Sequence, residues 1–184
     1  MKSLFMLPIL ISLLALSACA TQTTKTLYYT LPIVKATAME PQPTKQLILA
    51  PIELADFLQQ PGIVLQLDDI SIHAAQHHQW ADSLSSQLKR SLRDHLQAES
   101  TQYRVMSSTI AAKSASAYIL QIAFDQFQGR FDGQAVVSGQ WQLLTSQGEL
   151  VKMERFTLTE ALPAEGYPAL VRTLASTIET LSSS

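Results

Sequence analysis

The sequence contains a single cysteine in 184 residues, Cys19, so this thiol has no disulfide partner within the chain. The formal net charge at pH 7 is only -2, which excludes the strongly basic surface that binds nucleic acid. No Walker loop, nucleophile elbow or dinucleotide-binding fingerprint is present. We therefore expect neither catalytic residues nor a cofactor, and an enzyme of unfamiliar arrangement is the weaker alternative.

The amino-terminal segment has the pattern of a bacterial lipoprotein signal peptide. Lys2 precedes an apolar run that extends from Leu4 to Leu16, and Ser17, Ala18 and Cys19 follow. A small residue before the cleavage point is typical of signal peptides, and a cysteine directly after it forms the lipobox, whose thiol receives a diacylglycerol. The alternative is an unmodified cysteine at the end of a membrane anchor, but a span requires a longer run of roughly 20 apolar residues. We predict a signal peptide over residues 1-18 and lipidation of Cys19.

A short tether and one folded domain are expected after the lipidated cysteine. The small, polar composition of residues 20–26 predicts a tether over 19-26 and a single periplasmic domain over 27-184. No second long apolar run follows, so we expect acyl chains alone to reach the membrane. Several acyl chains anchor a protein stably, whereas one binds only marginally. Ala20 stands where an Asp would signal inner-membrane retention in enteric-type bacteria, and this favours the outer membrane.

Most of the domain has the composition and alternation of β-strands. The clearest alternation lies between Tyr118 and Asp125, where one row of side chains is more apolar than the other. Ser146-Gln147-Gly148 predicts a turn between the last two strands. The predicted strands cover residues 27–31, 46–52, 63–67, 70–73, 103–106, 118–125, 136–144 and 151–159.

Two segments have the period of amphipathic helices. In the first, Trp80 is followed by leucines at every fourth position from Leu84 to Leu96, so we expect a helix that begins near Trp80. Arg90 and Asp94 have the spacing of an ion pair on its exposed side. The second helix is predicted over residues 167–181. Strands that enclose one helix and precede another predict an α+β fold, a two-layer sandwich with a mostly antiparallel sheet and two amphipathic helices.

Three histidines, His73, His77 and His78, form the only tempting metal cluster. A zinc site needs three or four ligands held by rigid elements. These histidines lie in a polar, glutamine-rich stretch, which we interpret as a solvated loop. We therefore predict no metal site.

The segment from Phe127 to Gly133 combines aromatic and charged residues between two long predicted strands. One interpretation is a simple hairpin turn that uses the Asp132-Gly133 pair, with Arg130 and Asp132 solvated. The other is an exposed contact loop, because Phe and Arg are enriched at protein interfaces. Both interpretations remain open, and the candidate partner-binding residues are Phe127, Arg130, Phe131 and Asp132.

An ordered set of motifs over nearly the whole mature chain resembles the ABC-type transport auxiliary lipoproteins. After the lipobox, the motifs are Tyr28-Tyr29-Thr30-Leu31-Pro32, Asp56-Phe57-Leu58, Pro61-Gly62-Ile63-Val64, Trp80-Ala81-Asp82-Ser83-Leu84, Gly129-Arg130-Phe131-Asp132-Gly133 and Val137-Ser138-Gly139. No single motif is diagnostic, but their order is specific.

The resemblance implies a non-enzymatic lipoprotein of the outer membrane that faces the periplasm and docks an MCE-domain protein. MCE systems carry phospholipid or other hydrophobic molecules between the two membranes of the envelope. Their assemblies are ring-shaped, so a ring-shaped homo-oligomer is expected. The alternatives are an independent periplasmic lipid-binding module and an assembly-factor lipoprotein of the envelope.

Overall fold

The computed structural model describes residues 24–33, 45–100, 102–107 and 117–183. Cys19, the signal peptide and most of the predicted tether lie outside the described residues. The strands are β1 (Leu27–Tyr29), β2 (Lys45–Leu49), β3 (Glu53–Leu54), β4 (Gly62–Gln66), β5 (Ile72–Trp80), β6 (Tyr103–Ser107), β7 (Ala117–Arg130), β8 (Gln134–Thr145) and β9 (Leu150–Ala161). The helices are a short 3-10 helix η2 (Asp56–Leu58) and two α-helices, α2 (Leu84–Glu99) and α3 (Tyr167–Ser182).

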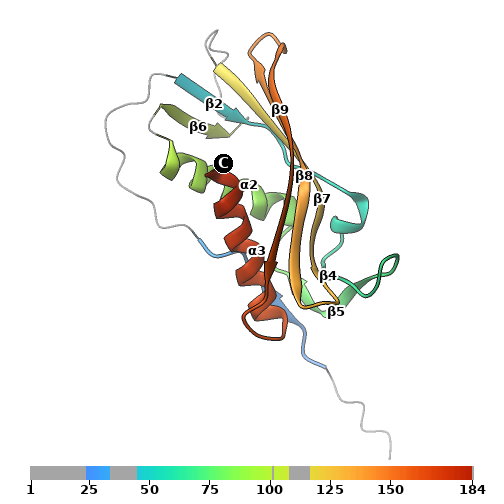
Figure 1. Ribbon diagram of the computed structural model, residues 1–184. Coiled ribbons are helices and arrows are strands. Elements are labelled where there is room, and N and C mark those ends of the chain that lie inside the picture. Colours follow the sequence, from blue (N-terminus) through green and yellow to red (C-terminus); the bar gives the residue numbers. More distant parts are fainter. Residues whose placement is uncertain (1–23, 34–44, 101, 108–116, 184) are drawn as a thin grey trace, which may run out of the picture.

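The long strand β7 organises a single nine-stranded sheet. One edge of β7 pairs with β8 along its whole length, and β8 pairs in turn with β9, both in antiparallel register. The other edge of β7 pairs in parallel with β2, β3 and β4 in succession. The longest ladders are antiparallel, and α2 and α3 lie side by side on one face of the sheet (Figure 1). The predicted α+β sandwich with two helices is therefore confirmed.

Both helices bury one stripe against the sheet, as their periodicity predicts. The stripe of α2 contains Leu84, Leu88 and Leu92, and that of α3 contains Leu170, Leu174 and Ile178. The helix α2 begins after Ser83, whose hydroxyl oxygen accepts a hydrogen bond from the amide of Ser86. The helices contact each other, and α3 also contacts β7, β8 and β9, so the core lies between the helix layer and the sheet.

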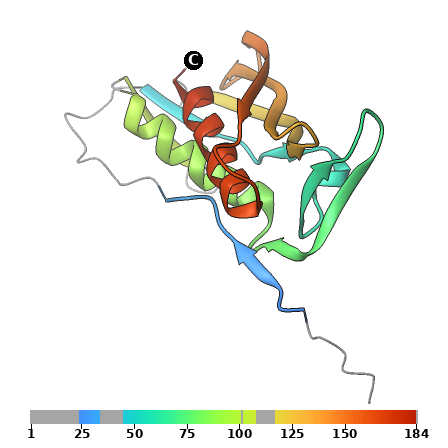
Figure 2. The same ribbon diagram turned by 60° about the horizontal axis from the view of Figure 1, so that its bottom comes forward.

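The segment before α2 is a strand, which corrects two predictions. Ile72–Trp80 forms β5, so the predicted histidine-rich loop is wrong, and the helix begins at Leu84 instead of near Trp80. Trp80 ends the strand and is buried beside Phe127, with their ring centroids 6.2 Å apart. Its spacing to the leucines resembles a helical repeat because both Trp80 and the helix face the same core. Figure 2 shows the β4–β5 hairpin extending away from the two helices.

The ion pairs of α2 also differ from the predicted one. Arg90 Nη1 lies 2.8 Å from Asp82 Oδ2, a residue that precedes the helix. Asp94 instead pairs with its neighbour Arg93, with 2.7 Å between Nη2 and Oδ1. Arg90 and Asp82 are exposed and Arg93 and Asp94 are partly exposed, so these pairs add little to stability.

Gly139 sits where β8 approaches the irregular part of β7, between Phe124 and Gln126. A methyl group added there would lie 2.0 Å from the carbonyl oxygen of Ala123 and 2.9 Å from Cζ of Phe156. We expect Gly139→Ala to lower the free energy of unfolding by about 1–3 kcal/mol, because the backbone oxygen can yield only if the strands separate. Chemical denaturation measures this change. The matched control Gln140→Ala, at an exposed site on the same strand, should stay within about 0.5 kcal/mol of wild type.

Candidate interaction sites

The turn between β7 and β8 carries three of the four predicted contact residues. Phe131 is 64% exposed at its tip. Arg130 donates from Nε and Nη2 to the carboxylate of Asp132, with distances of 2.5 to 3.0 Å, and from Nη2 to Gln134 Oε1 at 2.7 Å. The turn closes through Gly133, which has a φ of 77° and whose amide donates to the carbonyl oxygen of Arg130. The geometry presents one aromatic ring beside a fixed pair of opposite charges.

The pair of charges is stable across the neutral pH range. Hydrogen bonds from Arg130 hold the pKa of Asp132 below its ordinary value, and the carboxylate raises the pKa of Arg130 in return. Both groups remain accessible to solvent, so the pair adds little to the stability of the fold. Its main effect is to fix the positions of the two side chains on the turn.

Phe127, the fourth candidate, lies within β7 and is only 1% exposed. Its ring packs against Phe124 and Trp80, at centroid distances of 6.1 and 6.2 Å. Its side chain therefore offers no surface to a partner, and the loop begins later than the motif suggested. The irregularity of β7 between Phe124 and Gln126 shifts the alternation of its side chains, so a strict period of two from Tyr118 to Phe124 would place Phe127 in the more polar row.

A second exposed turn, which joins β4 to β5, was not among the predicted contact residues. It carries the apolar side chains Leu67, Ile70 and Ile72, all exposed. Gln66 at the end of β4 is in register with Arg130 at the end of β7, so the two turns leave the same edge of the sheet. A pair of aspartates flanked by apolar residues is the only sequence signal, and it is typical of many turns.

The β4–β5 turn is held by its own side chain. Asp68 Oδ1 accepts hydrogen bonds from the amides of Ile70 at 2.9 Å and Ser71 at 2.7 Å. The amide of Leu67 donates to the carbonyl oxygen of Ser71 at 2.8 Å. These bonds, led by the one from the Ile70 amide, lower the pKa of Asp68. The turn is thus preorganised with an ionised carboxylate facing inward to the backbone.

The three histidines do not converge. His73 is in register with Leu65 of β4, whereas His78 is in register with Leu27 of β1 at the other end of β5. Within the described ranges, no group of three His, Cys, Asp or Glu side chains is arranged to hold a metal ion. His78 instead stacks on Tyr167 of α3, with 3.9 Å between ring centroids, and its Nδ1 lies 2.9 Å from Tyr29 Oη of β1.

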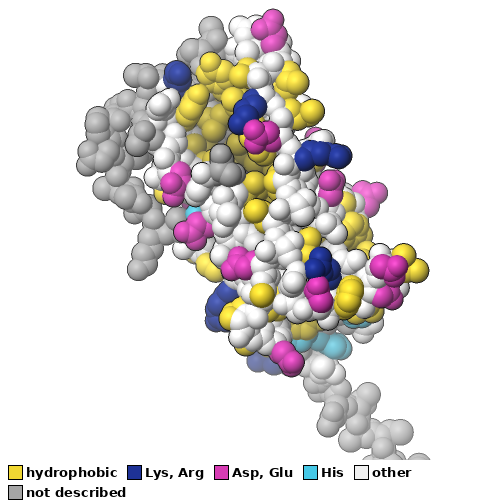
Figure 3. Space-filling view, viewed as in Figure 1, with side chains coloured by type: hydrophobic (Ala, Val, Ile, Leu, Met, Phe, Trp, Pro, Cys, Tyr) yellow, Lys and Arg dark blue, Asp and Glu magenta, His cyan; other side chains and the backbone are white. Residues whose placement is uncertain are grey.

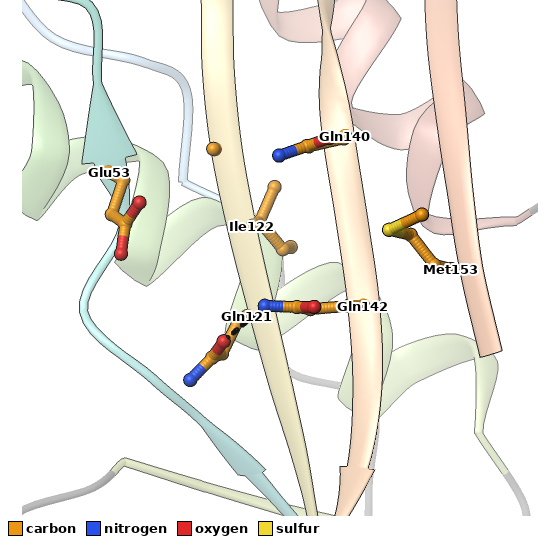
Figure 4. A pocket seen from close by; sticks show the side chains of 7 residues that line it. Glu53, Gln121, Ile122, Gln140, Gln142 and Met153 are labelled. Carbon is orange, nitrogen blue, oxygen red and sulfur yellow. Dashed lines mark hydrogen bonds between the residues drawn. The ribbon is translucent and has the colours of Figure 1, made fainter. Parts of the chain in front are cut away.

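Two small hollows lie away from these turns. The first, about 40 Å³, is on the face of the sheet opposite the helices, where Gln142 donates to Gln121 Oε1 at 2.6 Å between Glu53 and Met153 (Figure 4). The second, about 200 Å³, is lined by Leu49, Ser86, Lys89, Arg90 and Arg93. Both are smaller than the roughly 300–1,000 Å³ typical of sites for drug-sized ligands, so neither encloses a phospholipid.

A larger apolar surface lies near the end of the molecule opposite the tether. Figure 3 shows hydrophobic side chains in a hollow between β9 and the part of the sheet formed by β2 and β6, with charged side chains at its rim. Partly buried apolar residues on these and the intervening strands are Tyr103, Tyr118, Trp141 and Leu143. Lys152 Nζ lies 5.1 Å from the centroid of the Trp141 ring and 2.7 Å from Glu154 Oε1.

Comparison with known proteins identifies the class to which this fold and these surfaces belong. The family model of the ABC-type transport auxiliary lipoprotein component matches residues 29–184, and the chain belongs to this family. The family is one of transport auxiliary lipoproteins and not of enzymes. None of the helices in the described part of the chain is long and apolar enough to cross a bilayer.

Individual relatives make the similarity more specific. The intermembrane transport lipoprotein PqiC of Escherichia coli is 30% identical over 167 residues, which cover 90% of this chain and 87% of that protein. PqiC of Shigella flexneri gives the same values. A crystal structure of an uncharacterized protein has a TM-score of 0.74 at 27% identity and covers 86% of this chain and 94% of its own. A protein of Xanthomonas campestris shares the fold, with a TM-score of 0.69 at 18% identity over 86% of this chain and 91% of its own.

Proposed function

We propose that this chain is an outer-membrane lipoprotein that docks an MCE-domain protein of the PqiB type in an intermembrane lipid transport complex and so supports envelope integrity. The observation that carries the proposal is the similarity to PqiC, an intermembrane transport lipoprotein, over 90% of the chain. The lipobox at Cys19 supports attachment to a membrane through acyl chains, and Ala20 supports the outer membrane as its location.

The mechanism is docking. The acyl chains hold one end of the domain at the membrane, and the β7–β8 turn presents Phe131 and the Arg130–Asp132 pair to the partner. An exposed aromatic ring beside an arginine already fixed by its carboxylate loses little side-chain freedom on binding. A ring-shaped homo-oligomer would match the ring shape of MCE assemblies and could surround the end of such a ring.

We expect Phe131→Ser to weaken recovery of the MCE-domain protein by about tenfold, equivalent to roughly 1.4 kcal/mol, because aromatic anchors dominate interfaces of this kind. Cross-linking in cells followed by pull-down of the lipoprotein measures it. The matched control is Leu150→Ser, a change of similar exposure at the other end of the sheet. If wild-type protein reproducibly recovers no MCE-domain protein, the proposed function fails. If Phe131→Ser and Leu150→Ser behave alike, only the assignment of the turn fails.

The apolar hollow beside β9 favours a second candidate, an independent periplasmic lipid-binding lipoprotein. The hollow combines aromatic side chains such as Trp141 with a lysine, Lys152, over the Trp141 ring, and an ammonium group is suited to a phosphate headgroup. Mass spectrometry of the purified mature domain tests this function. Stoichiometric co-purifying phospholipid would support the carrier, and lipid-free protein that still recovers the MCE partner would support docking alone.

A further inference from the structure

We propose that the β4–β5 turn is a second membrane contact, which inserts Ile70, Leu67 and Ile72 into the interface of a zwitterionic bilayer and sets the orientation of the domain. The inference rests on the proposed lipidation of Cys19, because the anchor is what brings this turn to a lipid surface. In this proposal the bilayer covers an apolar patch that no other part of the described domain covers.

Exposed apolar side chains are concentrated at the two ends of the sheet. Those of β1 and of the β7–β8 turn lie at the end from which the chain continues toward Cys19, and the β4–β5 hairpin projects sideways from the domain near this end (Figure 1). They are Leu27, Tyr28, Leu67, Ile70, Ile72 and Phe131, and the opposite end has Leu150, Val151 and Met153; exposed Ile33, after β1, belongs to neither turn. The end nearest the anchor thus carries an aromatic residue at the base of the tether and aliphatic residues on a projecting turn, a distribution typical of interfacial contacts.

The hydrogen bonds within the turn hold the side chain of Ile70 toward solvent. Ile70 is 88% exposed although its own amide is fixed by Asp68, so its exposure follows from a closed hydrogen-bonded turn. Scattered exposed apolar residues are ordinary, but three within six residues on one rigid tip form a patch. A preorganised tip inserts without losing backbone freedom.

The length of the tether keeps this patch close to the membrane. Four residues separate Cys19 from Thr24, the first described residue, so their Cα atoms lie no more than about 18 Å apart even when the segment is fully extended. Leu27 of β1 is in register with His78, and Ile72 lies six residues earlier on β5, about 20 Å along the strand. With so short a tether, a modest tilt lays both β1 and the turn on the surface that holds the acyl chains.

The charges of the turn select the kind of lipid. Asp68 and Asp69 are its only charged residues, and residues 67–72 contain no Lys or Arg. Asp132 on the neighbouring turn is already neutralised by Arg130. A basic patch would seek anionic lipid, whereas this turn is repelled by it. The contact is therefore hydrophobic and favours phosphatidylethanolamine and phosphatidylcholine over phosphatidylglycerol.

The test places an environment-sensitive NBD fluorophore at the turn of the full lipidated protein. Lipidation converts the Cys19 thiol to a thioether, so an Ile70→Cys variant is labelled only at position 70. In vesicles of phosphatidylethanolamine and phosphatidylcholine, we expect blue-shifted, stronger emission and loss of quenching by aqueous iodide. The matched control, Val151→Cys at the opposite end, should show neither change. Replacing half of the lipid with phosphatidylglycerol should reduce the shift at position 70.

The outcomes separate this inference from the proposed function. If the protein does not float with the vesicles, the anchor is absent and the proposed function fails with it. If it floats but position 70 emits as it does in water, the membrane contact is overturned while the anchor stands. Emission that shifts only after an MCE-domain protein is added would assign the turn to that partner and also overturn the membrane contact. Equal shifts at positions 70 and 151 would show lipid adsorption without orientation and overturn the contact.

Discussion

Replacing Cys19 by alanine is expected to move nearly all of the protein from the membrane fraction to the soluble periplasm. Each methylene group of a buried acyl chain contributes about 0.8 kcal/mol to membrane binding, so one long chain outweighs the three exposed side chains of the β4–β5 turn. The turn can orient an anchored domain but cannot hold a free one. Fractionation of cells followed by immunoblotting measures the distribution.

The control for this experiment changes the neighbouring residue and keeps the anchor. Ala20→Asp should remain membrane-bound but shift toward the inner membrane, because Asp after the lipidated cysteine is the usual retention signal in enteric-type bacteria. Continued outer-membrane fractionation of the Cys19→Ala protein would contradict the lipid anchor. Membrane-bound Ala20→Asp protein would confirm that the signal peptide is still processed and Cys19 still lipidated when the residue next to the cysteine is changed.

Replacing Phe127 by alanine is expected to lower the free energy of unfolding by about 3–5 kcal/mol, a large part of the stability of a domain of this size. The ring is buried between Phe124 and Trp80, so its removal leaves a cavity that the long ladder of β7 and β8 cannot collapse to fill. Thermal or urea denaturation of the mature domain measures the loss.

Phe131→Ala is the matched control from the same motif. Four residues further along, the ring is 64% exposed on the turn, so its removal should change stability by no more than about 0.5 kcal/mol. Comparable losses in the two variants would show that the turn packs against the domain and would remove its availability for a partner. Loss of partner recovery without loss of stability is the result that the contact role requires.

Local sequence patterns were enough to predict the helices and strands that pack one apolar face on the core. The leucine period predicted α2 and α3, and alternation predicted the three long strands β7 to β9, because one face of each packs on the same core. They did not suffice for β5, whose residues from Ile72 to Gln79 are largely polar. That strand is stabilised by backbone pairing with β4 and β1, and such pairing leaves no hydrophobic period to recognise.

For the candidate sites, too, some features follow from the local sequence and others depend on how the strands pair. The Asp132-Gly133 pair predicted the turn, but Arg130 and Asp132, expected to be solvated in the hairpin interpretation, instead form a local ion pair. That Phe127 belongs to the core depends on the irregularity of β7 between Phe124 and Gln126, and that the β4–β5 turn leaves the same edge of the sheet depends on the register of β4 against β7. Parallel neighbours so far apart in sequence cannot be read from either segment alone.

The short strand β1 determines how mechanical load enters the domain. If the anchor and a docked partner pull apart, tension along the tether reaches Leu27–Tyr29 first, and parallel pairing with β5 sets this contact in shear along its length. Behind it, the amide of Leu31 donates to the buried Gln87 Oε1 of α2 at 2.8 Å, and Tyr29 is fastened to His78. Force between the two membranes would therefore enter through β1, pass into the helix layer and β5, and leave toward the partner at the β7–β8 turn, where Phe131 lies.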